Sequence, residues 1–205
     1  MGLEATCQAR MGRAVSAGKA RLEETDIVFR GEGDFRFKVP LEDLQRVDAR
    51  GGALYLEWAE GKAVLDLGDQ AARWAEKIKN PPSLLDKLGV KPGLRVSVVG
   101  IEDREFVDQL SARVDDLTRG RAKAGSDLVL VAMSGRADLP RLSKLREAIK
   151  ANGAIWVVWP KGRKEFREDD VRAFGPRAEL VDVKVMAFSE TLSALKMVIP
   201  LAKRG

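Results

Sequence analysis

Histidine is absent from the 205-residue sequence, and cysteine occurs once, at Cys7. The missing imidazole excludes Ser-His-Asp and Cys-His catalysis, and it removes histidine from any metal site. A single thiol can form neither an internal disulfide nor a thiolate metal cluster. We therefore expect no metal centre, and the low thiol content is typical of a protein of the reducing cytoplasm.

Long apolar runs are also missing. No stretch approaches the ~18 consecutive apolar residues that a membrane helix needs. The first residues do not show the basic segment followed by an apolar segment that marks a signal peptide. We expect no membrane partner and a cytoplasmic location.

What is present describes a folded chain. Hydrophobic residues make up 45% and charged residues 33% of the sequence, which is typical of a soluble globular protein. The length allows two small domains, each with its own core. The 36 basic and 31 acidic residues leave a net charge of +5. Because both signs are interspersed, nucleic acid is a partner that the composition allows but does not favour.

Residues 5–68 alternate between apolar and polar side chains in short runs that turn signals separate. In the clearest run, residues 35–39, Phe35, Phe37 and Val39 point one way and the basic residues the other. An apolar stripe at helical spacing follows at residues 71–78 and ends before two prolines. This pattern predicts six or seven antiparallel strands and one helix.

A meander of this kind, closed by a C-terminal amphipathic helix, resembles the pleckstrin-homology-like barrel. The resemblance implies that residues 1–82 form an antiparallel β-barrel closed by the helix, and that this domain is an adaptor for lipid head groups, peptides or sister domains. Five cations of the strands could share one face of such a barrel, and we interpret them as a solvated surface. They are Lys19, Arg21, Arg30, Arg36 and Lys38.

Residues 127–162 carry a strand, a helix and a second strand, a βαβ unit with a parallel sheet. Residues 94–100 predict another parallel strand, and residues 181–199 predict an antiparallel pair. An open parallel sheet that ends in such a hairpin resembles the Rossmann-like fold of S-adenosylmethionine-dependent methyltransferases. We predict this α/β domain over residues 83–205, so the fold class is α+β followed by α/β.

The second half also resembles a family of uncharacterised bacterial proteins with a domain of unknown function. The resemblance covers roughly residues 84 to 200 and implies no activity. It is carried by the motifs LGVKPG at residues 88–93, WVVWPK at residues 156–161, LVDVK at residues 180–184 and SETLSALK at residues 189–196.

Ligands of open α/β sheets bind at the carboxyl ends of the parallel strands. Three loops should lie there, at residues 100–103, 134–138 and 160–164. A methyltransferase would present a glycine-rich turn in the first loop, but this loop has one glycine followed by Ile-Glu-Asp. Asp115 or Asp116 could replace the usual acidic partner of a ribose. If a cofactor binds, the candidate residues are Gly100, Asp103, Ser134 and Trp159.

Two of these loops also carry four cations, an arrangement that can hold a phosphate or a carboxylate. The alternative is a solvated basic surface, because runs of charge usually face water. The candidate anion-binding residues are Arg136, Lys161, Arg163 and Lys164.

These observations favour a non-enzymatic protein with a binding, regulatory or scaffold role, because the glycine-rich loop, histidine and any pair of nucleophile and base are missing. Its partner would be a protein or a small anion, and no catalytic residue and no cofactor are expected. One alternative is a transferase that binds S-adenosylmethionine or a nucleotide at an atypical site. The other is nucleic-acid binding through the basic loops at residues 119–123 and 161–164.

Overall fold

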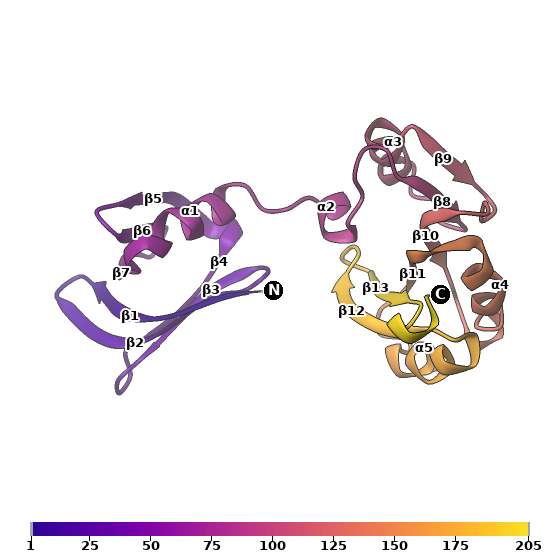
Figure 1. Ribbon diagram of the computed structural model, residues 1–205. Coiled ribbons are helices and arrows are strands. Elements are labelled where there is room, and N and C mark those ends of the chain that lie inside the picture. The colour runs from indigo at the N-terminus through magenta and orange to yellow at the C-terminus, as the bar shows by residue number, and fades with distance from the viewer. Residues whose placement is uncertain (1, 205) are drawn as a thin grey trace. The chain divides into compact units, whose positions relative to one another are not determined.

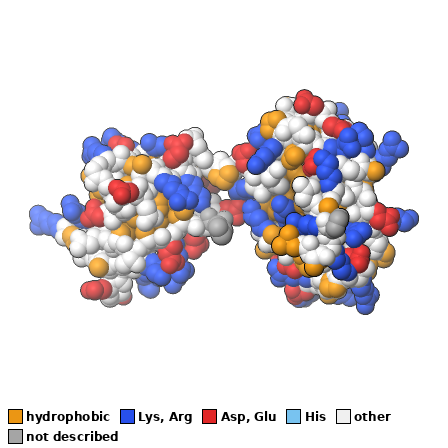
Figure 2. All heavy atoms as spheres, in the orientation of Figure 1, with side chains coloured by type: hydrophobic (Ala, Val, Ile, Leu, Met, Phe, Trp, Pro, Cys, Tyr) orange, Lys and Arg blue, Asp and Glu red, His pale blue; other side chains and the backbone are white. Residues whose placement is uncertain are grey.

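A computed structural model describes residues 2–204. The chain divides into two compact units, residues 1–82 and residues 83–205. Lys and Arg side chains are interspersed with Asp and Glu over the visible face of each unit (Figure 2). No helix within residues 2–204 combines the length and the apolar character that a membrane span requires.

The N-terminal unit is a seven-stranded antiparallel sheet in the order β4-β3-β2-β1-β7-β6-β5. The sheet is strongly curled, and helix α1 (Ala71–Lys79) packs against β5 and β6 (Figure 1). The strands are β1 (Leu3–Met11), β2 (Ala14–Leu22), β3 (Asp26–Gly31), β4 (Arg36–Pro40), β5 (Leu44–Arg50), β6 (Ala53–Trp58) and β7 (Gly61–Asp66).

The predicted apolar stripe of α1 is the face that the helix buries. Ala71, Trp74, Ala75 and Ile78 are all buried against the inward-facing side chains of the strands. Asp69 does not cap this helix, because it lies in a 3-10 turn, Gly68–Gln70, that precedes it.

The prediction of a closed barrel is wrong, because the sheet remains open. In the part of the chain that the structure describes, the edge strands β4 and β5 pair with one neighbour each and not with each other. β4 has five residues and ends at Pro40, which lacks an N–H, and a 3-10 turn (Leu41–Asp43) then carries the chain to β5. The resemblance to the pleckstrin-homology-like barrel is therefore not supported.

The C-terminal unit has a six-stranded mixed sheet in the order β12-β13-β11-β10-β8-β9. β9, β8, β10 and β11 are parallel, and β13 runs antiparallel between β11 and β12. The strands are β8 (Arg95–Val99), β9 (Asp116–Arg119), β10 (Ser126–Ala132), β11 (Ile149–Pro160), β12 (Val181–Ala187) and β13 (Leu192–Val198).

Helices cover both faces of this sheet (Figure 1). Leu85, Leu88, Phe106 and Leu110 of α2 and α3 belong to the apolar cluster on one face. Leu142, Leu145 and Val171 of α4 and α5 belong to the cluster on the other. The bounds are α2 (Leu84–Leu88), α3 (Arg104–Arg113), α4 (Arg141–Ala148) and α5 (Glu168–Phe174), with further 3-10 turns at Arg136–Asp138, Gly175–Ala178 and Leu201–Lys203.

Candidate functional site

The strand order of the C-terminal sheet reverses between β8 and β10. From β8 the chain passes through α3 to β9 on one side, and it then returns to β10 on the other side of β8. Loops that leave two such strands diverge and open a crevice at their carboxyl ends, where open α/β sheets bind ligands. Gly100 follows β8 and Ser134 follows β10 within two residues, so these two predicted residues flank the crevice.

Gly100 has a φ of 73°, in the left-handed region that other residues rarely adopt. A Cβ at this position would lie 3.6 Å from the Cβ of Ala132, which is an ordinary contact. The conformation, and not a lack of space, therefore favours glycine. Gly100 is exposed at the carboxyl end of β8.

Asp103 is the N-cap of α3. Its Oδ1 accepts a hydrogen bond from the backbone N–H of Phe106 at 3.0 Å. This bond satisfies one of the four free N–H groups of the first helical turn. No hydrogen bond of Oδ2 is found within residues 2–204, so that oxygen is left to accept one from a ligand.

Ser134 is tied to Asp138 within its own loop. Its backbone N–H donates to Oδ2 of Asp138 at 2.8 Å, and its hydroxyl lies 3.3 Å from the same oxygen. The backbone bond from Ser134 is the main cause that lowers the pKa of Asp138. The loop is therefore held in shape, while the long hydroxyl contact leaves the side chain of Ser134 able to exchange partners.

Asp116, a predicted acidic partner of a ribose, does not lie at the crevice. Asp116 opens β9 and pairs with Arg95 at the start of β8, so it lies at the amino edge of the sheet, opposite the crevice. Its carboxylate binds Arg95 at 2.7 Å and Lys123 at 3.0 Å. The carboxyl end of β9 instead presents Arg119, and the N–H of Gly120 donates to the carbonyl of Val98 at 2.8 Å. An exposed guanidinium thus stands where the sequence suggested a carboxylate.

Trp159 is the penultimate residue of β11, is 4% exposed and packs in the cluster that α4 and α5 cover. It also lies at the base of an open hollow of about 350 Å³ beyond the carboxyl end of β11. Trp156 belongs to the cluster on the opposite face. The hollow is lined by Trp159, Pro160, Lys161, Gly162, Arg163, Lys164, Phe166, Arg167, Glu168 and Ser193.

The hollow brings together three of the four predicted anion-binding cations. Arg163 and Lys164 are exposed and make no hydrogen bond or ion pair with other described residues. Lys161 donates to the backbone carbonyls of Ser189 at 2.6 Å and Glu190 at 3.1 Å, so its ammonium holds a turn.

Arg136 is not part of the hollow, because its guanidinium binds Asp170 at 2.8 Å. Sequence reasoning missed Arg167, which lines the hollow. Its place in the basic run of residues 161–167 was the available signal.

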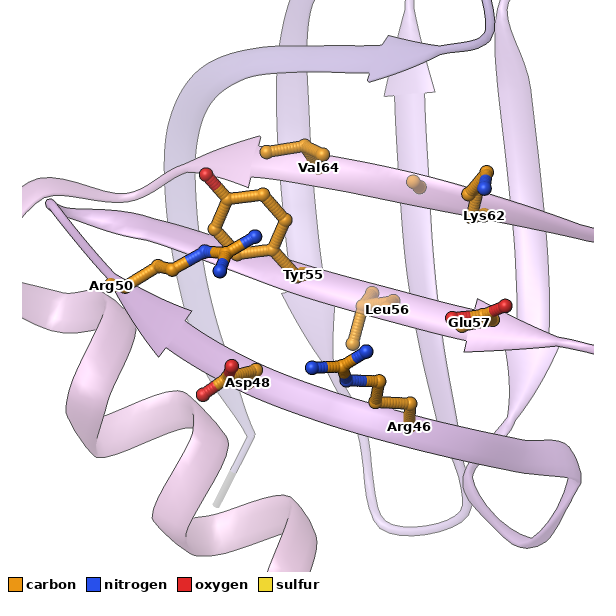
Figure 3. Close-up of a pocket in the computed structure, with 9 residues that line it drawn as sticks. Arg46, Asp48, Arg50, Tyr55, Leu56, Glu57, Lys62 and Val64 are labelled. Carbon is orange, nitrogen blue, oxygen red and sulfur yellow. The ribbon is translucent and has the colours of Figure 1, made fainter.

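A further hollow, of about 180 Å³, lies on the outer surface of β5, β6 and β7 in the N-terminal unit (Figure 3). Arg50 lies over the ring of Tyr55, 4.4 Å from its centroid. Arg46, Glu57 and Lys62 stand opposite one another on the three strands. Because the charges alternate along this row, the hollow has little preference for an ion of either sign, and we do not assign a ligand to it.

No protein-family model and no curated protein matches the sequence. The family of uncharacterised bacterial proteins is therefore not supported. The structure is similar to solved methyltransferases, all at low sequence identity. A putative type 11 methyltransferase from Sulfolobus solfataricus is 12% identical, with 58% of this chain and 91% of that chain covered and a TM-score of 0.46.

Two further matches are of the same kind. A methyltransferase dependent on S-adenosylmethionine from Aquifex aeolicus is 15% identical over 60% of this chain and 93% of its own, with a TM-score of 0.41. A TehB-like enzyme from Corynebacterium glutamicum is 14% identical over 64% of this chain and 97% of its own, with a TM-score of 0.39. The matched proteins are named as enzymes, so the prediction of a non-enzymatic scaffold is not supported.

Proposed function

We propose that the C-terminal unit is a transferase that binds an adenosine-bearing cofactor, S-adenosylmethionine or a nucleotide, in the crevice above β8 and β10. The observation that carries the proposal is the reversal of strand order at this point, with Gly100 in a left-handed conformation at the end of β8. The backbone of Gly100, the free oxygen of Asp103 and the hydroxyl of Ser134 supply the polar contacts.

The residues fit S-adenosylmethionine poorly at the ribose. A carboxylate at the end of the second strand binds free ribose hydroxyls in such folds, whereas an arginine accommodates a phosphate on the ribose. Arg119 holds that position here and pairs with Val98 in the strand register. The side chains thus favour a phosphorylated nucleotide over the methyl donor, and we assign no chemical step to either.

The hollow beyond β11 is the proposed site for the second substrate. Arg163 and Lys164 are unpaired cations among the described residues, and Arg167 lies beside them. Guanidinium groups bind carboxylates and phosphates through two parallel hydrogen bonds. We infer that the group-accepting substrate is an anion. Trp159, which is 4% exposed where it lines the hollow, would offer only a small apolar contact to that substrate.

Thermal unfolding of the full chain with a panel of ligands tests the proposal. The panel contains S-adenosylmethionine, its demethylated product, ATP, NAD and NADP. A ligand at a hundred times its dissociation constant adds about 2.7 kcal/mol of stability, which raises the melting temperature by a few degrees. We expect the largest shift with NADP, which serves here as a probe for recognition of a ribose phosphate by Arg119 and not as a group donor. A larger shift with S-adenosylmethionine would show that Arg119 does not select a ribose phosphate. The crevice would remain the proposed cofactor site.

Two variants, Gly100→Ala and Arg119→Glu, test whether a ligand that raises the melting temperature binds in the crevice. Gly100→Ala should reduce the shift, because alanine is strained at a φ of 73° and narrows the approach to the backbone. Gly93→Ala is the matched control, since Gly93 has a φ of 81° and no atom within 4 Å of an added Cβ, in a turn outside the crevice. Arg119→Glu should abolish the preference for NADP. No shift with any ligand, or equal effects of both alanine variants, would overturn the proposal.

A further inference from the structure

The outer surface of β2, β3 and β4 in the N-terminal unit carries a group of exposed cations, which we call the cationic face. The alternation of the strands puts these side chains opposite the buried core residues Ala20, Phe29 and Phe37. The cationic face consists of Lys19, Arg21, Arg30, Arg36 and Lys38.

Three of these cations form a row across the strands. Lys19 pairs with Arg30, and Arg30 pairs with Arg36. Neighbouring strands are about 4.8 Å apart, and like charges directly opposite one another destabilise a sheet. In the next row Val28 separates Arg21 from Lys38. The row from Lys19 to Arg36 is therefore an unfavourable arrangement unless anions lie against it.

Acidic side chains pair with the ends of the cationic face, and one further carboxylate, Glu23, lines the same hollow as Arg21 and Arg30. Glu4 binds Lys19 at 2.8 Å and Arg21 at 2.6 Å. Asp26 lies 3.4 Å from Lys38. Arg30 and Arg36 make no ion pair or hydrogen bond through their side chains with any residue in the range 2–204. The uncompensated charge is thus concentrated in two opposed guanidinium groups beside the edge of the sheet.

The surface around these groups is open and lacks exposed aromatic rings. Two adjoining hollows of about 230 Å³ and 590 Å³ share Val28, Arg30 and Lys38. Phe29 and Phe37 reach the second hollow but are buried. Proteins that bind single-stranded nucleic acid stack bases on exposed aromatic side chains. The cationic face offers contacts for phosphates and no platform for bases.

We propose that the cationic face binds the phosphodiester backbone of duplex nucleic acid. Arginine pairs suit phosphate because each guanidinium presents a fixed fork of donors. Repeated cations on an open surface match an extended polyanion, and paired bases need no stacking partner. Contacts to the backbone alone carry no sequence information, so the binding is independent of sequence. This inference stands apart from the proposed transferase function of the C-terminal unit.

Fluorescence anisotropy of the full chain with a labelled DNA duplex of mixed sequence tests this inference. The logarithm of the association constant should fall linearly with the logarithm of the salt concentration, by about 0.9 for each phosphate contacted. Arg30→Glu with Arg36→Glu should weaken binding at least ~10-fold at low salt and reduce the slope by about two contacts. A single-stranded oligonucleotide of the same length should bind more weakly than the duplex.

The matched control is Arg10→Glu with Arg13→Glu. This pair reverses two exposed cations at the β1–β2 turn of the same unit, where Arg10 faces Val15 and Val64, so it changes the net charge equally and sets no like charges opposite one another. Arg36→Glu alone should leave melting unchanged or raise it, because it places opposite charges across β3 and β4, and this separates lost binding from lost folding. Equal losses in both double variants, or tighter binding to single strands, would overturn the inference. The inference would also be overturned if the protein bound anionic lipid vesicles through Arg30 and Arg36 but did not bind DNA.

Discussion

The indole Nε1 of Trp156 donates a hydrogen bond to the backbone carbonyl of Leu88 at 2.9 Å, and both residues are fully buried. The bond ties the last residue of α2 to the middle of β11. Trp156→Phe would leave a buried carbonyl without its donor, which costs about 1–3 kcal/mol. Hydrogen exchange of the β10 and β11 amides should show this loss. Unchanged protection would mean that water replaces the indole.

Trp74 differs from Trp156 in the hydrogen bonding of its indole N–H. Its side chain is fully buried, but its indole N–H has no hydrogen-bond partner among the described residues. Trp74→Phe therefore removes an unsatisfied donor together with some packing volume, and the two effects oppose each other. We expect a smaller loss of protection in the N-terminal unit than Trp156→Phe causes in the C-terminal unit. An equal or larger loss would show that packing of the ring dominates.

Ser97 and Ser126 form a buried hydroxyl pair between β8 and β10, with 2.9 Å between their Oγ atoms. Ser126 donates to the carbonyl of Lys123 at 2.6 Å, and Ser97 accepts from the N–H of Lys123 at 3.0 Å. Ser97→Ala should cost about 1–3 kcal/mol in urea unfolding, since it removes the acceptor of that N–H. The control Ser111→Ala removes a part-buried hydroxyl, on an exposed residue, that donates to the carbonyl of Val107 within α3, and it should change stability by less than about 0.5 kcal/mol.

Cys7 should react slowly with alkylating reagents. Burial, with a smaller effect from the charge of Asp66, raises the pKa of this thiol to about 11. At pH 8 the thiolate is then on the order of 100-fold scarcer than for a free thiol, and the thiolate is the reactive form. Iodoacetamide labelling should accelerate as the pH rises toward 11, and Asp66→Asn should accelerate it at fixed pH. Equal rates in the native and the urea-unfolded protein would contradict this prediction.

Asp86 should make the stability of the C-terminal unit depend on pH in acid. The hydroxyl of Ser83 and then the guanidinium of Arg113 lower the pKa of this carboxyl to about 2. Because the folded pKa lies below the unfolded one, the contribution is complete above the ordinary aspartate pKa and disappears as the pH falls through about 2. Asp86→Asn should therefore lower the urea midpoint clearly at neutral pH and much less at pH 2. Asp108 is exposed and its carboxylate has no ion pair among the described residues, so the effect of Asp108→Asn should not change between neutral pH and pH 2.

Local periodicity was sufficient to predict the buried stripe of α1 and the alternating faces of residues 35–39. These features depend on residues close together in sequence. The position of Asp116 was not predictable in the same way, because the boundary between α3 and β9 decides which edge of the sheet it occupies. The opposition of Arg30 and Arg36 likewise depends on strand register. Alternation shows which residues share a face, whereas only pairing between strands shows which of them meet.

The open form of the N-terminal sheet was the feature hardest to predict, because it depends on contacts between residues far apart in sequence. β1 pairs with β2 along its whole length, from Leu3 to Met11. It pairs with β7 only through residues 8–10, which meet residues 64–66. Whether the two ends of the sheet then meet is a property of curvature, which alternating polarity does not encode.

The short pairing of β1 with β7 has a consequence for how this unit folds. The hairpins from β1 to β4 and from β5 to β7 can form from neighbouring residues, but joining them must close a long loop through three residue pairs. Contacts between residues distant in sequence form slowly, because chain entropy is lost before they stabilise the structure. The joining of β1 to β7 is thus expected to limit the refolding rate. Until it occurs, β1 and β7 each expose an unpaired edge through which two chains could exchange strands.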